Sequence, residues 1–251
     1  MCQCCCAVLL CLLLASPVAA NAAPTTLTAA QQQAVERYLL ENPDVIVHAL
    51  TAYRARVEDQ QRGDQAAAVT AFRSLVASDG DSFPRAGDSS GPGLFAEFFD
   101  YQCGYCKRVF PDVMATIAAD PRLNVVFVEL PVLSPASVVA ARAALAAERQ
   151  GRYVEVHSAL MRHRGPLSDA VILEIVRALG LDMEQLQRDM ADPVLQARIA
   201  RNLQWAHRLG IDGTPAFVIG DGLTIGALGG PALRAAIAAA RQPPSLREGG
   251  K

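Results

Sequence analysis

The pattern of apolar and polar positions predicts a helical N-terminal part before any strand appears. A first helix is expected over residues 29–40, after Thr28 as its cap, and a second from about Pro43 to Arg62. In the second, apolar side chains recur at the 4-3-4 spacing of a coiled-coil seam, at Ile46, Leu50, Tyr53 and Val57. Gly63 is expected to end this helix, and a further helix is predicted over 65–77.

The pattern changes after residue 93, where short apolar runs alternate with helical segments. Leu94–Tyr101 and Asn124–Leu130 read as strands on either side of a helix that starts near Cys103 and contains Pro111. A strand, a helix and a strand at this spacing predict a parallel βαβ unit. Helical segments then fill about 137–209, and two short strands joined by Gly220–Gly222 predict a hairpin before a last helix from Pro231 to about Arg241.

Changes in composition divide the chain further. A stretch rich in Ser, Asp, Gly and Pro separates the N-terminal helices from the first strand and marks the best domain boundary. We therefore predict a leader at 1–22, a helical segment at 23–79, a linker at 80–93, a mixed domain at 94–241 with a helical insertion at about 137–209, and a loose tail at 242–251.

Composition excludes some functions and allows others. The chain has 251 residues, 51% of them apolar, and a formal net charge of -2. Such a balance lacks the basic footprint of a nucleic-acid-binding protein, so we expect no nucleic-acid partner. Apolar content of this size supports a sizeable core. The N-terminal stripe either packs on its own domain or joins copies of the chain into a homo-oligomer through residues 28–77.

The seven cysteines fall into two groups. Five lie in the first eleven residues, within or before a short apolar run that small residues follow. This arrangement is typical of a secretory leader cleaved after Ala20 or Ala22, with the periplasm as destination. No Lys or Arg precedes the apolar run, which leaves an uncleaved anchor or a misassigned start codon as alternatives. A cleaved chain keeps only Cys103 and Cys106, so it has no disulfide framework to explain them.

Cys103-Gly104-Tyr105-Cys106 is the stretch that carries chemistry. On a helix, Cys103 and Cys106 face the same way, and the positive end of the helix dipole stabilises a thiolate there. A disulfide across so short a loop adds little to fold stability. We therefore predict a redox-active disulfide between these residues, with no further cofactor.

A metal site is the competing interpretation of the same two thiols. Reduced Cys103 and Cys106 are soft ligands that suit Cu(I). No His-rich or Met-rich tract accompanies them, and no ligand spacing for zinc is found at the four histidines, His48, His157, His163 and His207. We expect no metal site of the zinc kind. A third alternative is a binding protein with idle cysteines.

Cys103-Gly104-Tyr105-Cys106, Pro111, the helical insertion and Gly213-Thr214-Pro215 together resemble the DsbA-like branch of the thioredoxin superfamily. Within it, the chain is similar to exported ScsC-type or Com1-type proteins, which carry a Leu-Glu-Asn-Pro stretch in a helical N-terminal segment, here 40–43. The resemblance implies an α/β, thioredoxin-like fold (βαβ…ββα) with a helical insertion, preceded by an N-terminal helical segment.

Roles for individual residues follow from the resemblance. It makes Cys103 the nucleophile and Cys106 the resolving cysteine, and it makes Pro215 the cis-proline beside the active site. Thr214 then offers backbone groups to an extended substrate, and Gly104 and Tyr105 complete the substrate-binding residues. Glu97, six residues before Cys103, matches a buried acid that takes the proton of the resolving thiol, although a solvated strand edge or an ion pair is the alternative.

The dipeptide between the cysteines directs the choice of activity. Strongly oxidising relatives have a histidine there, whereas Gly104-Tyr105 supplies no cation and matches the dipeptide of DsbC-type isomerases. The resemblance thus implies a protein disulfide oxidoreductase that leans to isomerisation. A net dithiol oxidase and a Cu(I)-binding protein of a copper-tolerance system are the alternatives. The implied partners are unfolded or mis-oxidised exported proteins and a membrane redox protein for recycling.

Overall fold

The computed structural model describes residues 27–78, 82–91 and 94–242. Two compact units divide the chain between Val57 and Glu58, inside one helix rather than at residues 80–93. The leader predicted at 1–22 and nearly all of the tail predicted at 242–251 lie outside the described residues. Within the described residues, no helix is both long enough and apolar enough to cross a bilayer.

The N-terminal unit contains helix α1 (Ala29–Glu41) and the start of α2 (Asp44–Ser78). Thr28 caps α1 through a reciprocal pair of hydrogen bonds, because its Oγ1 accepts from the Gln31 amide at 3.3 Å while Gln31 Oε1 accepts from the Thr28 amide at 2.9 Å. No residue of α1 is buried. Large apolar side chains therefore remain exposed along this unit, among them Tyr38, Leu40, Ile46, Leu50 and Tyr53.

The predicted break at Gly63 is wrong. Helix α2 continues through it for 35 residues, and a Cβ at this position would meet nothing within 4 Å. A glycine in a helix interior costs about 1 kcal/mol relative to alanine. The flanking turns, which are rich in Ala, Gln and Arg, form a helix favourable enough to absorb that cost.

The last turns of α2 belong to the core of the second unit. Ala68, Val69, Phe72 and Val76 are buried among sheet residues. The Phe72 ring lies 5.8 Å from that of Phe83, 5.3 Å from that of Phe98 and 5.6 Å from that of Trp205. These contacts explain why the second unit begins inside the helix, well before the stretch rich in Ser, Asp and Gly.

The second unit is built on a five-stranded sheet of order β1-β3-β2-β4-β5. Among the neighbouring strand pairs of this sheet, only β2 and β3 are parallel, and α3 (Gly104–Ala119) connects them, which confirms the predicted βαβ unit. The predicted hairpin is present as β4 and β5. The five strands are β1 (Arg85–Gly87), β2 (Leu94–Phe99), β3 (Asn124–Glu129), β4 (Ala216–Ile219) and β5 (Gly222–Ile225).

Strand β1 is an addition to the predicted elements, since residues 80–93 were expected to form only a linker. It pairs antiparallel with β3 at the edge of the sheet. Gly87, at its end, has a φ of 72° and approaches the carbonyl of Leu123 so closely that a Cβ would lie 2.0 Å from its oxygen. Only glycine fits this position.

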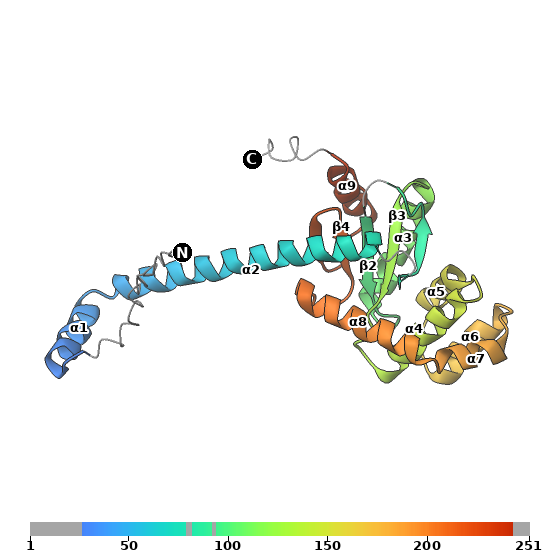
Figure 1. The fold of residues 1–251 in the computed structure, drawn as a ribbon, viewed down its shortest axis with the longest axis horizontal. Coiled ribbons are helices and arrows are strands. Elements are labelled where there is room, and N and C mark those ends of the chain that lie inside the picture. The colour runs from blue at the N-terminus through green and yellow to red at the C-terminus, as the bar shows by residue number, and fades with distance from the viewer. Residues whose placement is uncertain (1–26, 79–81, 92–93, 243–251) are drawn as a thin grey trace, which may run out of the picture. The chain divides into compact units, whose positions relative to one another are not determined.

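Helices cover both faces of the sheet (Figure 1). On one face, the sheet packs against α3, α9 (Gly230–Ala240) and the insertion, and on the other against the end of α2 and part of α8. The predicted insertion is helical throughout most of its length. Its helices are α4 (Pro135–Glu148), α5 (Tyr153–Arg162), α6 (Asp169–Ala178), α7 (Met183–Met190) and α8 (Pro193–Leu209).

Candidate active site

Cys103 stands at the junction between β2 and α3. It is the N-cap of α3, and its Sγ accepts a hydrogen bond from the Cys106 amide at 3.4 Å. The turn before it is held by Asp100, whose carbonyl accepts from the Cys103 amide at 3.0 Å. Both cysteines are free thiols in the structure. The amides at the start of α3 therefore surround the sulfur that the sequence predicts to be the nucleophile.

The segment before β4 brings Thr214 and Pro215 to the same sulfur. Cys103 Sγ lies 3.2 Å from the Thr214 carbonyl oxygen, to which the protonated thiol donates a hydrogen bond, and the Thr214–Pro215 peptide bond is cis, as the family resemblance implies. A hydrogen bond with the Cys106 side chain is the main cause that lowers the pKa of Cys103 to about 5, with smaller contributions from Thr214 and from backbone amides. Cys103 is therefore a thiolate at neutral pH.

Cys106 lies one turn further along α3 in a different environment. Its side chain is fully buried. Burial raises the pKa of the Cys106 thiol far above its ordinary value, and its hydrogen bond to Cys103 and the charge of Glu97 act in the same direction. The two cysteines therefore divide between one thiolate and one thiol that keeps its proton.

Glu97 is buried in the middle of β2, as the sequence predicted for the acid near the cysteines. Its Oε2 has no hydrogen-bond partner in the described part of the chain. Burial, followed by the charge of Cys103, raises the pKa of Glu97 to about 8. The mutual effects of Glu97 and the two cysteines on one another's pKa place all three in one electrostatic unit. The alternative of a solvated edge or a simple ion pair is wrong.

A second buried acid, Glu129, was missed by the sequence reasoning. Its Oε1 accepts hydrogen bonds from the hydroxyls of Tyr101 and Tyr153, each at 2.8 Å, and Tyr101 Oη lies 3.1 Å from His157 Nδ1. Burial raises the pKa of Glu129 well above its ordinary value and lowers that of His157 to about 3, so His157 is neutral at neutral pH. The sequence did contain a feature that could have indicated this buried acid, because Glu129 is a single carboxylate at the end of an otherwise apolar strand.

Asp100 is the other residue that the sequence reasoning passed over. Its carboxylate is buried and fixes the turn before the cysteines. Oδ1 accepts from the Gln102 amide at 2.7 Å and from the Ser137 hydroxyl at 2.8 Å, while Oδ2 accepts from the amides of Val132 and Leu133 at 2.9 and 3.0 Å. These bonds join the active-site turn to the segment after β3 and the start of α4.

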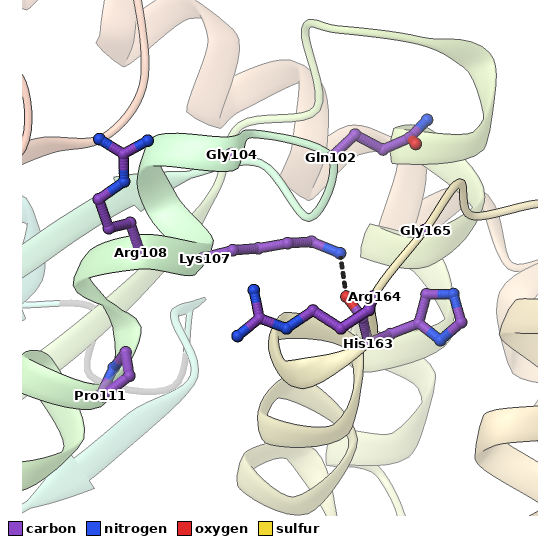
Figure 2. A pocket seen from close by; sticks show the side chains of 8 residues that line it. All are labelled: Gln102, Gly104, Lys107, Arg108, Pro111, His163, Arg164 and Gly165. Carbon is purple, nitrogen blue, oxygen red and sulfur yellow. Dashed lines mark hydrogen bonds between the residues drawn. The ribbon is translucent and has the colours of Figure 1, made fainter.

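Gly104 and Tyr105, predicted to bind substrate, are exposed beside Cys103. The guanidinium of Arg108 lies over the Tyr105 ring, 5.0 Å from its centroid. Next to them is a cleft of about 430 Å³ (Figure 2). We name it the cationic cleft because Lys107, Arg108 and Arg164 are among the residues that line it. Gln102, Gly104 and His163 also contribute to the lining.

The remaining candidate chemistry at the site is metal binding. In the residues that the structure describes, no group of three or more Cys, His, Asp or Glu side chains is arranged to hold a metal ion. His157 lies within α5 and His163 caps the C-terminal end of the same helix, whereas His207 lies on α8. A metal at this site would therefore have to rely on the two sulfurs of Cys103 and Cys106.

Comparison with known proteins gives the family. The model of the DsbA-like thioredoxin domain matches residues 96–238, more than half of the chain, and that range contains both cysteines and Thr214-Pro215. The chain belongs to the DsbA-like thioredoxin family. The matched range begins one residue before Glu97 and ends inside α9, so the DsbA-like domain includes the sheet from β2 onwards and the whole insertion.

Solved structures of similar fold cover this DsbA-like domain and, in some cases, the segment before it. A thioredoxin-like oxidoreductase from Silicibacter pomeroyi DSS-3 is 42% identical, with a TM-score of 0.63 over 65% of this chain and 94% of that one. A linker-deletion mutant of ScsC from Proteus mirabilis is 25% identical, with a TM-score of 0.66 over 87% of this chain and 98% of that one. The fold is thus that of DsbA-like thiol–disulfide oxidoreductases.

This chain matches curated relatives over only part of their own length. A Na(+)/H(+) antiporter NhaA 1 from Salinispora arenicola is 31% identical over 175 residues, which are 69% of this chain. The match spans only 27% of the antiporter's length. This likeness therefore concerns a part of those proteins.

Proposed function

We propose that this chain is an exported thiol–disulfide oxidoreductase that acts on protein disulfides at Cys103 and leans to isomerisation. The contrast within the cysteine pair is the observation that carries the proposal. Cys103 is a thiolate at neutral pH because hydrogen bonds lower its pKa to about 5, whereas burial keeps Cys106 protonated. A reduced, ionised nucleophile is what attack on a substrate disulfide requires.

The first step is thiol–disulfide exchange. The Cys103 thiolate attacks one sulfur of the substrate disulfide, a bond forms between protein and substrate, and the other substrate sulfur leaves as a thiolate. The hydrogen-bond donors around Cys103 Sγ stabilise the thiolate before attack and again whenever it is the leaving group. No electrons are gained or lost by the pair of molecules as a whole.

Two fates are open to the mixed disulfide. In isomerisation, another thiolate of the substrate attacks the substrate sulfur, a new substrate disulfide forms, and Cys103 leaves as a thiolate. In resolution, Cys106 attacks Cys103, the protein becomes oxidised, and the substrate leaves with both sulfurs reduced. Resolution needs Cys106 to lose its proton, which burial disfavours. The delay gives the substrate's own thiols time to attack, and this favours isomerisation.

Glu97 is the proposed acceptor for the proton of Cys106. A pKa of about 8 allows this carboxyl to exchange a proton near neutral pH, and its Oε2 has no other partner in the described residues. Once the charge of Cys103 is lost in the mixed disulfide, the pKa of Glu97 falls, because that charge contributes to raising it. A larger fraction of Glu97 is then ionised at neutral pH and able to accept the proton of Cys106.

Substrate binding is assigned to the exposed surface around Cys103. Gly104 and Tyr105 flank the sulfur on α3, and the segment at Thr214-Pro215 lies on its other side. An extended peptide that pairs with backbone groups of Thr214 would present its cysteine to Cys103 without the need for a particular side-chain sequence. Such recognition suits unfolded or mis-oxidised exported proteins as substrates. A membrane redox protein is proposed to restore the starting redox state.

The exposed apolar stripe of the N-terminal unit supports self-association. Ile46, Leu50 and Tyr53 are each 45% or more exposed and follow the coiled-coil spacing. We propose that residues 28–77 join copies of the chain into a homo-oligomer, so that several Cys103 sites act on one substrate. Leu50→Glu should then lower the mass in solution measured by light scattering. Ala55→Glu adds the same charge at an exposed position off the stripe and should leave the mass unchanged.

Recovery of enzyme activity from a scrambled multi-disulfide protein tests the proposed reaction. Catalytic amounts of the reduced protein should reactivate the scrambled substrate, Cys106→Ser should retain part of this activity, and Cys103→Ser should have none. A parallel assay supplies the oxidised protein to a fully reduced substrate. Efficient oxidation in that assay, together with a Cys106→Ser variant that reshuffles nothing, would establish a net oxidase instead.

A further inference from the structure

The cationic cleft begins at the nucleophile but is separate from the segment at Thr214-Pro215. Gln102 and Gly104, the neighbours of Cys103 in the chain, form one end of its lining. Neither Thr214 nor Pro215 contributes to it. A substrate held at Cys103 therefore has a second, independent surface available on the side of α3 and the segment after α5.

Three cationic residues line this cleft, and they come from two parts of the chain. Figure 2 shows Lys107 extending from α3 towards the segment after α5, and Arg164 extending from that segment back towards α3. Arg108 comes from α3 as well. The lining contains no acidic residue, and no carboxylate in the described residues forms an ion pair with any of the three cations.

The arrangement places like charges close together. Lys107 Nζ donates to the His163 carbonyl at 2.8 Å, which holds the ammonium group next to the residue that precedes Arg164. Burial, and then the charge of Arg164, lower the pKa of Lys107, while the charge of the buried Asp100 acts in the opposite direction and is outweighed. An anion bound between the two cations would relieve this repulsion, and the N-terminus of α3 favours negative charge in the same place.

The cations are not the main support of the thiolate. The lowered pKa of Cys103 comes from its hydrogen bonds with Cys106 and Thr214 and from backbone amides. The chain as a whole has a formal net charge of -2, so the cleft is a local concentration of positive charge. We therefore expect this positive charge to attract a negatively charged group on a molecule that approaches Cys103.

We propose that the cationic cleft binds a carboxylate side chain of the substrate polypeptide, close in sequence to the cysteine that Cys103 attacks. This inference rests on the proposed thiol–disulfide exchange and names the substrates that it favours, which are acidic segments around reactive disulfides. Arg164 and Lys107 contact the carboxylate from opposite sides, and Arg108 contributes at the edge. These residues position the substrate, while Cys103 carries out the exchange.

Three peptides of equal length test the inference with the full-length reduced protein. Each contains one cysteine in a disulfide with the neutral leaving group 2-thiopyridine. The first has two glutamates near the cysteine, the second has glutamines there, and the third has the glutamates at its far end. Cys103 attacks the peptide sulfur, and the thiopyridine sulfur leaves, taking up a proton to give 2-thiopyridone. Cys106 then displaces the peptide as a thiol.

The release of 2-thiopyridone gives the second-order rate constant. At low salt, the peptide with nearby glutamates should react about fivefold faster than the glutamine peptide, the size expected for a solvated ion pair. The peptide with remote glutamates should show less than half of this gain. High salt should bring all three rates together. Arg164→Gln should reduce the preference to about twofold, and Arg108→Gln combined with Arg164→Gln should remove it.

Arg177→Gln is the matched control, because Arg177 is an exposed arginine on α6 outside the cleft. It removes the same charge from the protein and should keep the full preference. Arg164→Glu leaves the cleft with the same net charge as the double variant and should likewise remove the preference. Equal rates for the three peptides with the unaltered protein would overturn the cleft proposal alone. If none of the peptides reacts, the proposed thiol–disulfide exchange itself fails.

Discussion

The two faces of the central sheet differ in chemistry although they share the same strands. On the face towards α3 and α5, the side chains of β2 and β3 include Glu97 and Glu129 beside phenylalanines. On the face towards α2, the buried side chains of the same strands are all apolar, namely Leu94, Ala96, Phe98, Val126 and Val128, and the polar Asn124 at the start of β3 is only partly buried. Alternation along a strand places neighbours such as Glu97 and Phe98 on opposite faces. One face thus serves chemistry and the other serves stability.

The largest effect is expected on the apolar face. Phe98 is fully buried, with its ring 5.3 Å from that of Phe72, so Phe98→Ala leaves a cavity between β2 and α2. The free energy of unfolding should fall by about 4 kcal/mol. The rate of thiol–disulfide exchange per folded molecule should stay the same. Urea unfolding and peptide kinetics measure the two quantities, and Phe98→Leu serves as the milder variant. A lower exchange rate in the folded variant would contradict the separation of the faces.

The next effect concerns the neighbour of Phe98 on the other face. The pKa of Glu97 is raised from its ordinary value of 4.5 to about 8, so the folded state binds its proton more tightly than the unfolded state does. This contribution to stability is complete below pH 4.5 and is lost as the pH rises towards 8. Glu97→Gln should therefore stabilise the reduced protein by about 3 kcal/mol near pH 7.5 and by little at pH 4.5.

Unfolding curves recorded across this pH range check the expectation for Glu97. A difference between Glu97→Gln and the unaltered protein that stays constant with pH would show that the carboxyl does not titrate as its buried position requires. The same variant should slow resolution of the mixed disulfide by Cys106, since it removes the proposed proton acceptor. This second readout distinguishes a role in proton transfer from a cost in stability alone.

A smaller effect is expected for the hydrogen bonds of Glu129. Tyr153→Phe removes one of the two hydroxyls that donate to Glu129 Oε1 and leaves the other in place. The free energy of unfolding should fall by about 1 kcal/mol, the usual net value of one hydrogen bond. Combining it with Tyr101→Phe should cost more than the sum of the two, because the carboxyl oxygen then has no donor. Strict additivity in unfolding experiments would argue against a shared site.

The smallest effect concerns the thiolate itself. Thr214→Ala removes the side-chain hydrogen bond of Thr214 that helps to lower the pKa of Cys103, while the backbone of Thr214 and the larger contribution from Cys106 remain. We expect the pKa of Cys103 to rise by less than about one unit. Ultraviolet absorbance of the thiolate, titrated with Cys103→Ser as the blank, measures the change. A rise of several units would mean that the segment at Thr214, rather than the start of α3, is the main support of the thiolate.

Local patterns in the sequence were sufficient for much of this architecture. The apolar runs on both sides of Cys103 predicted the βαβ unit, and the position of Glu97 in such a run was compatible with its burial. The proximity of Thr214 to Cys103 came only from the family resemblance. The two residues are 111 positions apart, and no periodicity tells which distant segments meet.

Features that depend on long-range pairing escaped prediction for the same reason. Strand β1 has three residues and forms because β3 offers it a partner, so its own composition indicated a loop. Lys107 and His163, which meet in the cationic cleft, are 56 positions apart. The prediction at Gly63 failed for a different reason. The helix-destabilising effect of glycine was clear in the sequence, whereas the stability that a helix of 35 residues gains from its length was not.

The position of Cys103 at the start of α3 also determines how electron transfer is coupled to protons. Since its pKa is about 5, reduced Cys103 has already given up its proton at pH 7, and Cys106 alone of the two sulfurs still holds one. Reduction of the disulfide between them therefore takes up two electrons but only one proton at the sulfurs. Between pH 5 and the lower pKa that Glu97 has when Cys103 is in a disulfide, the midpoint potential of this pair should fall by about 30 mV per pH unit, half the value for two protons. The reduced cysteine pair therefore has one more negative charge than the disulfide.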